Sequence, residues 1–377
     1  MLKDPISEKF SPQNILILQP AFPHYRISFF RAIFECSRIS GALYFSHGGE
    51  NFAKNIEFSE DFAIPIGRIR TLPFGIIWQV GALGVPMRPQ DVLVMSGNPR
   101  ILSNLAVAIR ARLKGVKIIW WGHYWSSTSK SWRFALRLWM MRIADAIMFY
   151  TDQEVEEYKS NSGKHDRRPI TALNNGIDLE PVRLTRRLPY IASDRPRDLL
   201  FIGRITPKSE LGLAIEALAH PECDTLTLDI IGDGPQTKSQ QQYARHLGVD
   251  DRIAWHGASI DPEFIGEIAN KCKAFVYPGA VGLSLIHGLA YGLPAIIHNA
   301  RWRHMPEIAA HLPGTNGVNF EYRNVKALAE VIENLLNSPA ELESMSRACV
   351  ETVENSFNTR DMARRFVSFV QDVNANG

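Results

Sequence analysis

Basic and glycine-rich turns follow three of the expected strands in the second half of the chain. Arg204 and Lys208 lie four positions apart just after an apolar run, and Gly232-Asp233-Gly234-Pro235 follows the next run. A third turn, residues 278–284, is rich in small residues and leads into an apolar helix. The unpaired N–H groups at a helix start carry about +0.5 of a charge and favour an anion, most often a phosphate. A ligand-free turn or a solvated cation pair would explain each turn alone, but three at one sheet edge favour a diphosphate site.

Such turns meet only if a parallel sheet brings them to one edge. We expect strands at residues 199–202, 226–231, 253–256, 274–277 and 294–298, with helices between them near 210–219, 236–247 and 262–270. Buried strands that alternate with helices are typical of a doubly wound parallel sheet. Ligands of such sheets bind in the crevice at the carboxyl ends of the strands.

The first half shows the same alternation. We expect strands at residues 14–18, 42–45, 91–95, 116–121 and 146–150, and helices at 27–34, 100–114 and 132–143. Ser96 or Asn98 is the expected cap of the second helix, and Thr151 or Asp152 caps a short helix with glutamates in its first turns. The loop after the first strand lacks G-x-G-x-x-G, which argues against a dinucleotide fold of the usual NAD type.

One histidine and one helix of the first half have two readings each. His123 follows a strand where such sheets bind ligands, but a histidine hydrogen-bonded within a loop is equally compatible with that place. The helix over residues 132–143 carries three arginines that, with neighbouring basic and aromatic residues, could form a face on a membrane surface: Lys130, Trp132, Arg133, Arg137, Trp139 and Arg142. An internal helix with a few solvated arginines is the alternative.

Length and composition restrict the class of protein. With 377 residues, the chain fits two domains, which we place at residues 1–178 and 179–355, followed by a C-terminal helix over 356–377 that packs back on the first domain. The net charge of +3, without a Lys/Arg run, argues against nucleic acid. Four dispersed cysteines favour a reducing cytosol over a disulfide framework. We expect no signal peptide and no membrane span.

Several short motifs in a fixed order resemble the retaining glycosyltransferases of family 4, which have the GT-B fold of two Rossmann-like domains. The motifs of the second half are Asn174-Asn175-Gly176-Ile177-Asp178, Phe201-Ile202-Gly203-Arg204, Ile231-Gly232-Asp233-Gly234-Pro235, Trp255-His256-Gly257, Gly282-Leu283-Ser284, Ala290-Tyr291-Gly292-Leu293-Pro294 and Pro306-Glu307. The first half matches more loosely, through Pro23-His24-Tyr25-Arg26, Ser96-Gly97-Asn98-Pro99-Arg100 and Trp121-Gly122-His123.

The resemblance implies roles for these residues. Arg204 and Lys208 would neutralise the departing diphosphate, although the family's second basic residue usually stands one position later, at Ser209. His123 would lie at the donor sugar. Three groups complete the implied site: the amides of Gly282, Leu283 and Ser284 for the phosphate, Gly234 and Gly257 near the base, and Tyr25 and Arg26 in the acceptor loop.

The resemblance fails at two positions. Most members of the family carry two glutamates eight positions apart, one facing the donor sugar and one the ribose, and this chain has Gly279 and His287 there. A histidine still hydrogen-bonds hydroxyl groups, whereas a glycine offers only its backbone. The chain therefore resembles a variant without both glutamates, with altered donor contacts or reduced activity.

The implied activity is the transfer of a sugar from a nucleotide-sugar to a saccharide or lipid-linked saccharide in cell-surface polysaccharide assembly. The nucleotide-sugar is a substrate, so we expect no cofactor, and the sequence has no D-x-D pair to hold a metal on the diphosphate. A cytoplasmic protein, peripheral on the inner face of the membrane, fits such an acceptor. A nucleotide-sugar epimerase of GT-B fold and a non-catalytic binder of nucleotide-sugars are the alternatives.

Overall fold

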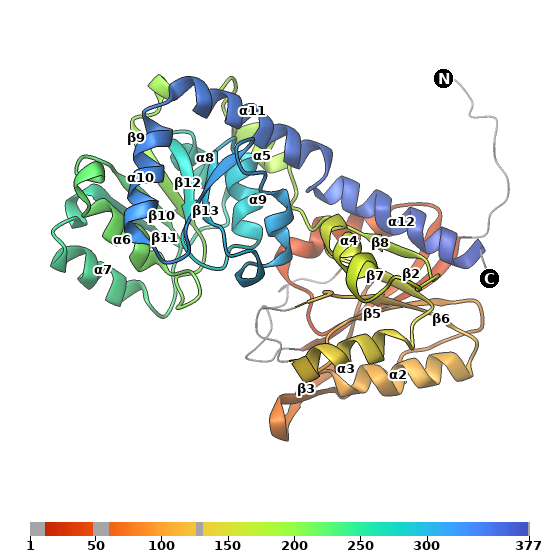
Figure 1. Cartoon of the computed structure of the whole chain (residues 1–377). Helices are drawn as coiled ribbons and strands as arrows, with labels where there is room; N and C mark the ends of the chain where they lie inside the picture. Colours follow the sequence, from red (N-terminus) through yellow and green to blue (C-terminus); the bar gives the residue numbers. More distant parts are fainter. Residues whose placement is uncertain (1–11, 48–59, 126–130, 376–377) are drawn as a thin grey trace, which may run out of the picture. The chain divides into compact units, whose positions relative to one another are not determined.

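The computed structural model of the protein describes residues 12–47, 60–125 and 131–375. Contacts divide the chain into two compact units (Figure 1). Unit 1 comprises Met1–Leu173 and Met362–Gly377, and unit 2 comprises Asn174–Asp361. Each unit is built around its own sheet, so the predicted pair of doubly wound α/β domains is present.

The sheet of unit 1 has eight strands in the order β4-β3-β2-β1-β5-β6-β7-β8. All neighbours pair in parallel except the edge strand β4, which is antiparallel to β3. The strands are β1 (Gln13–Gln19), β2 (Ile39–His47), β3 (Ala63–Leu72), β4 (Ile76–Gln79), β5 (Val92–Ser96), β6 (Lys117–Trp121), β7 (Ala146–Phe149) and β8 (Ile170–Ala172). The strand order reverses between β1 and β5, where a doubly wound sheet opens its crevice.

Both faces of this sheet are buried, as the continuous apolar runs predict. Along β1, Ile15 and Ile17 belong to one core cluster, whereas Leu16 and Leu18 belong to the other. The first cluster includes residues of α1 (Ile27–Phe34) and α12 (Thr359–Ala375), and the second includes residues of α2 (Leu102–Leu113), α3 (Ser131–Met141) and α4 (Asp152–Asn161). Helices therefore cover the two faces of the unit 1 sheet (Figure 1).

The last helix of the chain belongs mostly to unit 1. Phe366, Phe369 and Val370 of α12 are buried in the same cluster as Phe29 of α1, and the Phe366 and Phe29 rings meet edge to face at 5.9 Å. This apolar face of α12 packs on the core of unit 1.

The sheet of unit 2 has six parallel strands in the order β11-β10-β9-β12-β13-β14. This is the doubly wound order 3-2-1-4-5-6, and its reversal lies between β9 and β12. The strands are β9 (Arg197–Ile202), β10 (Leu228–Ile231), β11 (Ile253–Gly257), β12 (Cys272–Tyr277), β13 (Ala295–His298) and β14 (Gly317–Phe320). The helices are α5 (Glu180–Thr185), α6 (Leu211–Leu218), α7 (Thr237–His246), α8 (Pro262–Ala269), α9 (Leu283–Ala290), α10 (Val325–Leu336) and α11 (Pro339–Asn355).

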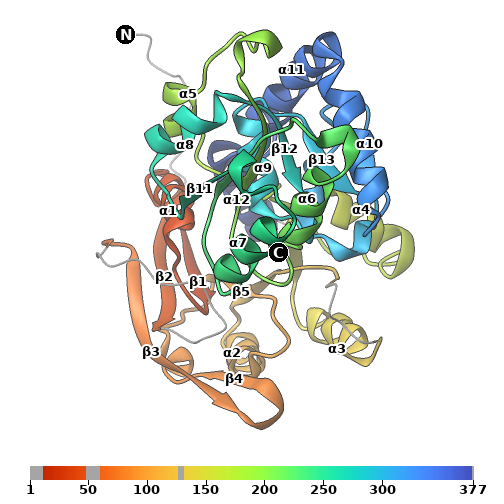
Figure 2. The same ribbon diagram turned by 90° about the vertical axis from the view of Figure 1, so that its left-hand side faces the viewer.

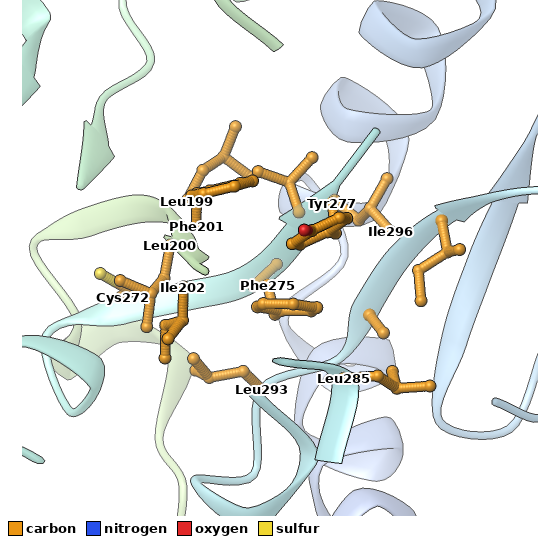
Figure 3. Close-up of a cluster of buried hydrophobic side chains, with 14 of the residues drawn as sticks. Leu199, Leu200, Phe201, Ile202, Cys272, Phe275, Tyr277, Leu285, Leu293 and Ile296 are labelled. Atoms are coloured by element: carbon orange, nitrogen blue, oxygen red, sulfur yellow. The ribbon is translucent and has the colours of Figure 1, made fainter. Parts of the chain in front are cut away.

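The core of unit 2 is one continuous cluster around β9 and β12 (Figure 3). The rings of Phe201 and Tyr277, on these two strands, stack with their centroids 4.8 Å apart. Leu285 of α9 and Leu293, from the turn after this helix, belong to the same cluster. The central strands are thus fixed on both sides of the point where the strand order reverses.

Two predicted details of unit 1 differ from the structure or are refined by it. Neither Ser96 nor Asn98 caps α2. The helix starts at Leu102, its N-cap residue is Ile101, and no side chain caps it. The side chain of Asn98 instead accepts a hydrogen bond from the Arg100 amide at 3.0 Å and closes the preceding turn. Thr151 caps α4, and it forms a capping box with Glu154. No helix in the described part of the chain is sufficiently long and apolar to span a bilayer.

Candidate active site

The residues of the implied diphosphate site lie at the carboxyl edge of the unit 2 sheet. Gly203 and Arg204 follow β9, and residues 278–282 follow β12 and lead into α9. Because β9 and β12 are the neighbours at which the strand order reverses, these two turns border the crevice of this sheet. The turn that contains Gly232 and Gly234 follows β10, on the other side of β9.

Glycines allow the turns after β9 and β10 to touch through their backbones. A Cβ atom on Gly232 would lie 1.9 Å from the carbonyl oxygen of Gly203, and one on Gly234 would lie 2.2 Å from that of Ile205. A Cβ on Gly203 would meet the Ser284 hydroxyl at 2.9 Å. The structure therefore brings the predicted turns after β9, β10 and β12 together into one continuous edge.

Helix α9 begins at Leu283 without a side-chain cap, with Gly282 as its N-cap residue. The amides of Leu283 and Ser284 are thus first-turn donors, the groups that a helix cannot satisfy internally. The Ser284 hydroxyl lies beside Gly203, so this helix start faces the turn after β9. The arrangement suits an anion such as a phosphate.

The two cations of this edge differ in their setting. The side chains of Arg204 and Lys208 are exposed, and within the described residues neither forms an ion pair. Lys208 contributes its backbone, because its carbonyl accepts a hydrogen bond from the Ala280 amide at 2.8 Å. Ser209, where the family usually has a basic residue, is buried and bonds through its hydroxyl to both backbone groups of Thr206. It holds the loop in place.

The structure leaves no space for a side chain at position 279. Gly279 is buried, and a Cβ atom there would lie 2.2 Å from the Lys208 carbonyl oxygen and 2.5 Å from the Ser209 carbonyl carbon. Both are backbone atoms, so no side-chain rotation relieves the overlap. The loop of residues 206–209 therefore occupies the space that a side chain at position 279 would need.

His287 lies one turn into α9 and is half-buried. Burial lowers the pKa of its imidazole to about 4, so the ring is neutral near pH 7. A neutral imidazole offers one donor and one acceptor, which suits the hydroxyl groups of a ribose.

A pair of histidines that the sequence analysis missed supports the loop after β12. The rings of His298 and His304 stack with their centroids 3.8 Å apart, and His304 Nδ1 accepts a hydrogen bond from the Val281 amide at 3.3 Å. Burial lowers the pKa of His298 to about 4 and that of His304 to about 3. Neutral rings thus hold Val281 directly before the N-cap of α9. The only signal in the sequence is a histidine at the end of a strand.

The residues expected near the nucleotide base differ in how far they are free to contact a ligand. Gly257 ends β11 with a positive φ of 74° and open space around its Cα, and its carbonyl accepts a bond from the Gly232 amide at 2.8 Å. The amide of Gly234 is bonded to Asp233 and Thr237, so it is already used in the turn. His256 is bonded to Asp229 at 2.6 Å, which places its ring against the sheet.

His123 lies in unit 1, directly after β6. Its ring stacks on Tyr150 with the centroids 4.1 Å apart, and its Nδ1 lies 3.8 Å from the carboxylate of Glu154. Glu154 is fully buried and accepts bonds from the amides of Tyr124, Tyr150 and Thr151. The carboxylate therefore fixes the two turns around His123, whereas the sequence suggested only a favourable charge in the first turn of α4.

The described residues of α3 bear on the two readings of this helix, a basic and aromatic membrane face or an internal helix. Arg137 is buried and donates to the carbonyl oxygen of Tyr124 at 3.3 Å, and burial lowers the pKa of its guanidinium. Trp139 and Arg142 are exposed. Lys130 lies outside the described residues, as do the side chains of Trp132 and Arg133. Arg137 thus supports the internal-helix reading.

The predicted acceptor residues, Tyr25 and Arg26, lie in the 3-10 turn between β1 and α1. Tyr25 is half-exposed, whereas Arg26 is buried among aromatic rings that include Trp121 and Tyr150. Tyr150 also carries the His123 stack. Arg26 and His123 therefore belong to one cluster at the carboxyl edge of the unit 1 sheet.

A comparison with known proteins relates the second half of the chain to a family. Residues 189–351 match the family profile described as glycosyl transferases group 1. The matched residues cover most of unit 2, which contains the turns at Arg204 and Gly282.

The curated relatives of the protein resemble parts of it. A glycogen synthase of Mycobacterium tuberculosis is 26% identical over 237 residues, which are 61% of this chain and 54% of that protein. A lipopolysaccharide 1,6-galactosyltransferase of Salmonella typhimurium is 26% identical over 136 residues, which are 34% of this chain and 38% of that protein. The match thus spans about half the length of the glycogen synthase.

Solved structures match nearly the whole length of the chain. The lipopolysaccharide outer core galactosyltransferase WaaB superposes with a TM-score of 0.69 at 16% identity, covering 96% of this chain and 99% of WaaB. The pneumococcal O-GlcNAc transferase GtfA, solved in complex with UDP and GlcNAc, gives a TM-score of 0.69 at 12% identity, with coverages of 96% and 99%. The predicted GT-B fold is therefore confirmed.

Proposed function

We propose that the protein is a retaining glycosyltransferase that moves a sugar from a nucleoside-diphosphate sugar to a saccharide or lipid-linked saccharide acceptor. The observation that carries the proposal is the convergence of Arg204 with the uncapped start of α9 at the crevice of the unit 2 sheet. Fixed donors and a cation placed where a leaving diphosphate develops charge are a large source of catalysis. The polysaccharide and lipopolysaccharide enzymes among the relatives support the acceptor class.

In this proposal the acceptor hydroxyl attacks the anomeric carbon as the bond to the diphosphate breaks. The hydroxyl proton passes to a phosphate oxygen of the leaving group on the same face, so the configuration is retained. Arg204, Lys208 and the amides of Gly282, Leu283 and Ser284 hold the diphosphate, and His287 binds the ribose. His123 stabilises the positive charge at the anomeric carbon through its ring or main-chain groups, while unit 1 binds the acceptor.

A donor screen tests the binding half of the proposal. UDP-, GDP- and ADP-sugars are added singly and the melting temperature is measured, because a ligand of the folded state stabilises it by RT ln(1 + [L]/Kd). We expect one base to stabilise the protein clearly above the others. No stabilisation by any of the three at millimolar concentration would contradict a nucleotide-sugar site.

Product analysis with the selected donor then separates the alternatives. An epimerase would convert the donor without an acceptor, whereas a non-catalytic binder would bind nucleoside diphosphate yet release none. We expect release that depends on an acceptor, with the anomeric configuration of the donor kept in the NMR spectrum of the product. An inverted product would reject the retaining mechanism.

A membrane contact fits a lipid-linked acceptor, and we place it on the β3–β4 hairpin of unit 1 (Figure 2). Phe74 at the tip is fully exposed, and Leu72 beside it is 40% exposed. Arg68 and Arg70 are exposed on the same face as Leu72, on either side of the half-buried Ile69, and neither arginine forms an ion pair within the described residues. Apolar residues at a tip with arginines behind them suit the surface of an anionic bilayer.

The hairpin contact is tested with Phe74→Ser and Arg70→Ser in vesicle sedimentation. We expect the partition coefficient on phosphatidylglycerol vesicles to fall about tenfold for Phe74→Ser and about fivefold for Arg70→Ser. Leu184→Ser, at an exposed leucine of unit 2, is the control and should bind as the wild type does. Equal binding of all four proteins, or no preference over phosphatidylcholine vesicles, would place the contact elsewhere.

A further inference from the structure

Arg26 is a buried cation that has no anionic partner among the described residues of unit 1. Its side chain is only 8% exposed, although it follows a loop at the sheet edge. Within the described residues no carboxylate pairs with it, and its Nη1 is buried without a hydrogen-bond partner. Guanidinium groups remain charged and carry five donors, so an unsatisfied one in a dry site is costly.

Aromatic rings form the walls around this guanidinium. Its central carbon lies 5.5 Å from the ring centroids of Tyr25 and Trp121, and 5.9 Å from those of Phe29 and Tyr150. Cation–π contacts offset part of the desolvation, but a ring face accepts no hydrogen bond from the planar N–H fork in the way an anion does. The walls also keep water away, which strengthens any ion pair formed there.

The position of Arg26 relates it to the proposed chemistry. It follows β1, one of the two strands between which the order of the unit 1 sheet reverses. Tyr150 lies against both Arg26 and the stacked ring of His123. A ligand held by Arg26 would therefore bind beside the residue that is expected at the donor sugar.

We propose that Arg26 binds an anionic group of the acceptor, a phosphate or a carboxylate, and so makes the enzyme selective for negatively charged acceptors. This inference rests on the proposed transfer reaction. The guanidinium fork matches two oxygens of either group, and a neutral saccharide would leave its donors unsatisfied. Arg26 is then a specificity-determining residue of unit 1.

Anion binding is measured first, without any need for turnover. The protein, saturated with UDP to fill the donor phosphate site, is titrated with inorganic phosphate and, separately, with malonate while the melting temperature is recorded. We expect both or one of them to stabilise the wild type, and the one that acts identifies the anion class. Arg26→Gln should bind it about ten- to hundredfold more weakly, and Arg26→Lys should fall between the two.

The control is Arg31→Gln on the neighbouring helix, where an exposed arginine pairs with Glu60. It should bind phosphate and malonate as the wild type does. The proposal would be overturned if phosphate or malonate raised the melting temperature of Arg26→Gln as much as that of the wild type. It would also be overturned if neither anion raised the melting temperature of either protein. Weaker UDP binding by Arg26→Gln would also overturn it, because the arginine would then serve the donor.

Transfer assays form the second arm. The same sugar is offered as a methyl glycoside, as a 1-phosphate and as a uronic acid, and kcat/KM is compared between wild type and Arg26→Gln. We expect kcat/KM for the charged acceptors to fall more in the variant than kcat/KM for the neutral glycoside, so that the charged acceptors lose their advantage. If no acceptor reacts and no UDP binds, the proposed function fails, yet the phosphate and malonate titrations still decide whether Arg26 binds anions.

Discussion

A glutamate introduced at position 279 is expected to destabilise unit 2 and to leave the protein without activity. The family resemblance suggests the opposite, since Gly279→Glu would restore the carboxylate that most members carry there. In this chain the Cβ atom would overlap three backbone atoms, the carbonyl oxygen of Lys208 and the carbonyl carbon and oxygen of Ser209, at 2.2, 2.5 and 2.6 Å. Backbone atoms give way only if the whole loop moves.

The movement would break the bonds that hold the loop of residues 206–209. These are the bond from the Ala280 amide to the Lys208 carbonyl and the two bonds of the Ser209 hydroxyl. Overpacking of this kind costs about 1–3 kcal/mol and occasionally more. We expect the free energy of unfolding, measured in urea, to fall by at least about 2 kcal/mol, with loss of the stabilisation by UDP-, GDP- or ADP-sugars.

Two alanine variants separate the overlap from other effects of the glutamate. Gly279→Ala adds only the Cβ atom and should be destabilised nearly as much as Gly279→Glu. Gly212→Ala, in α6, places its Cβ 3.3 Å from the far end of the Gln240 side chain, which can rotate away, so it should be neutral or slightly stabilising. A stable Gly279→Glu protein with tighter donor binding would show that the loop adapts and that the glutamate is merely missing.

The sequence predicts the central strands of both units well because a strand that is buried on both faces is a continuous run of apolar residues. In β1 every residue from Ile15 to Leu18 is apolar, since both faces of a central parallel strand are covered. The pattern is weaker in β3 and in the edge strand β4. Arg68 and Arg70 of β3 are exposed on either side of the half-buried Ile69, and β4 has only four residues, so the sequence predicts neither strand. The sequence does not predict β14 either, because Asn319 interrupts a strand of only four residues.

The backbone part of the candidate site is also predictable, whereas its side-chain contacts are not. Glycines just after β9, β10 and β12 predict that the backbone there lies close to other parts of the chain, and the structure has these contacts. Arg137 and Glu154 look like solvated helix charges in the sequence, yet both are buried and brace the turns around His123. Whether a charge on a helix faces water depends on what packs against it, and no local pattern contains that information.

Replacement of Arg204 by alanine is expected to give a large loss of activity with little change in stability. The side chain is exposed and forms no ion pair within the described residues, so its removal should change the free energy of unfolding by less than about 0.5 kcal/mol. If it neutralises the leaving diphosphate, kcat/KM should fall by about 10²–10³-fold. Arg204→Lys, which keeps the charge and loses the fork, should recover part of that loss.

Lys208→Ala and Arg245→Ala show whether the effect belongs to position 204 or to positive charge in general. Arg245, in the last turn of α7, is likewise exposed, and its replacement should leave kcat/KM unchanged. Lys208 lies four residues farther along the loop, so we expect a smaller loss than at Arg204, about tenfold. The helix start at Gly282 would still hold the phosphate in Arg204→Ala and Lys208→Ala, so in these two variants the UDP affinity should fall less than kcat/KM. If Arg204→Ala had the UDP affinity and the kcat/KM of the wild type, Arg204 would not belong to the diphosphate site. The amides at the start of α9 would then be the remaining anion-binding element.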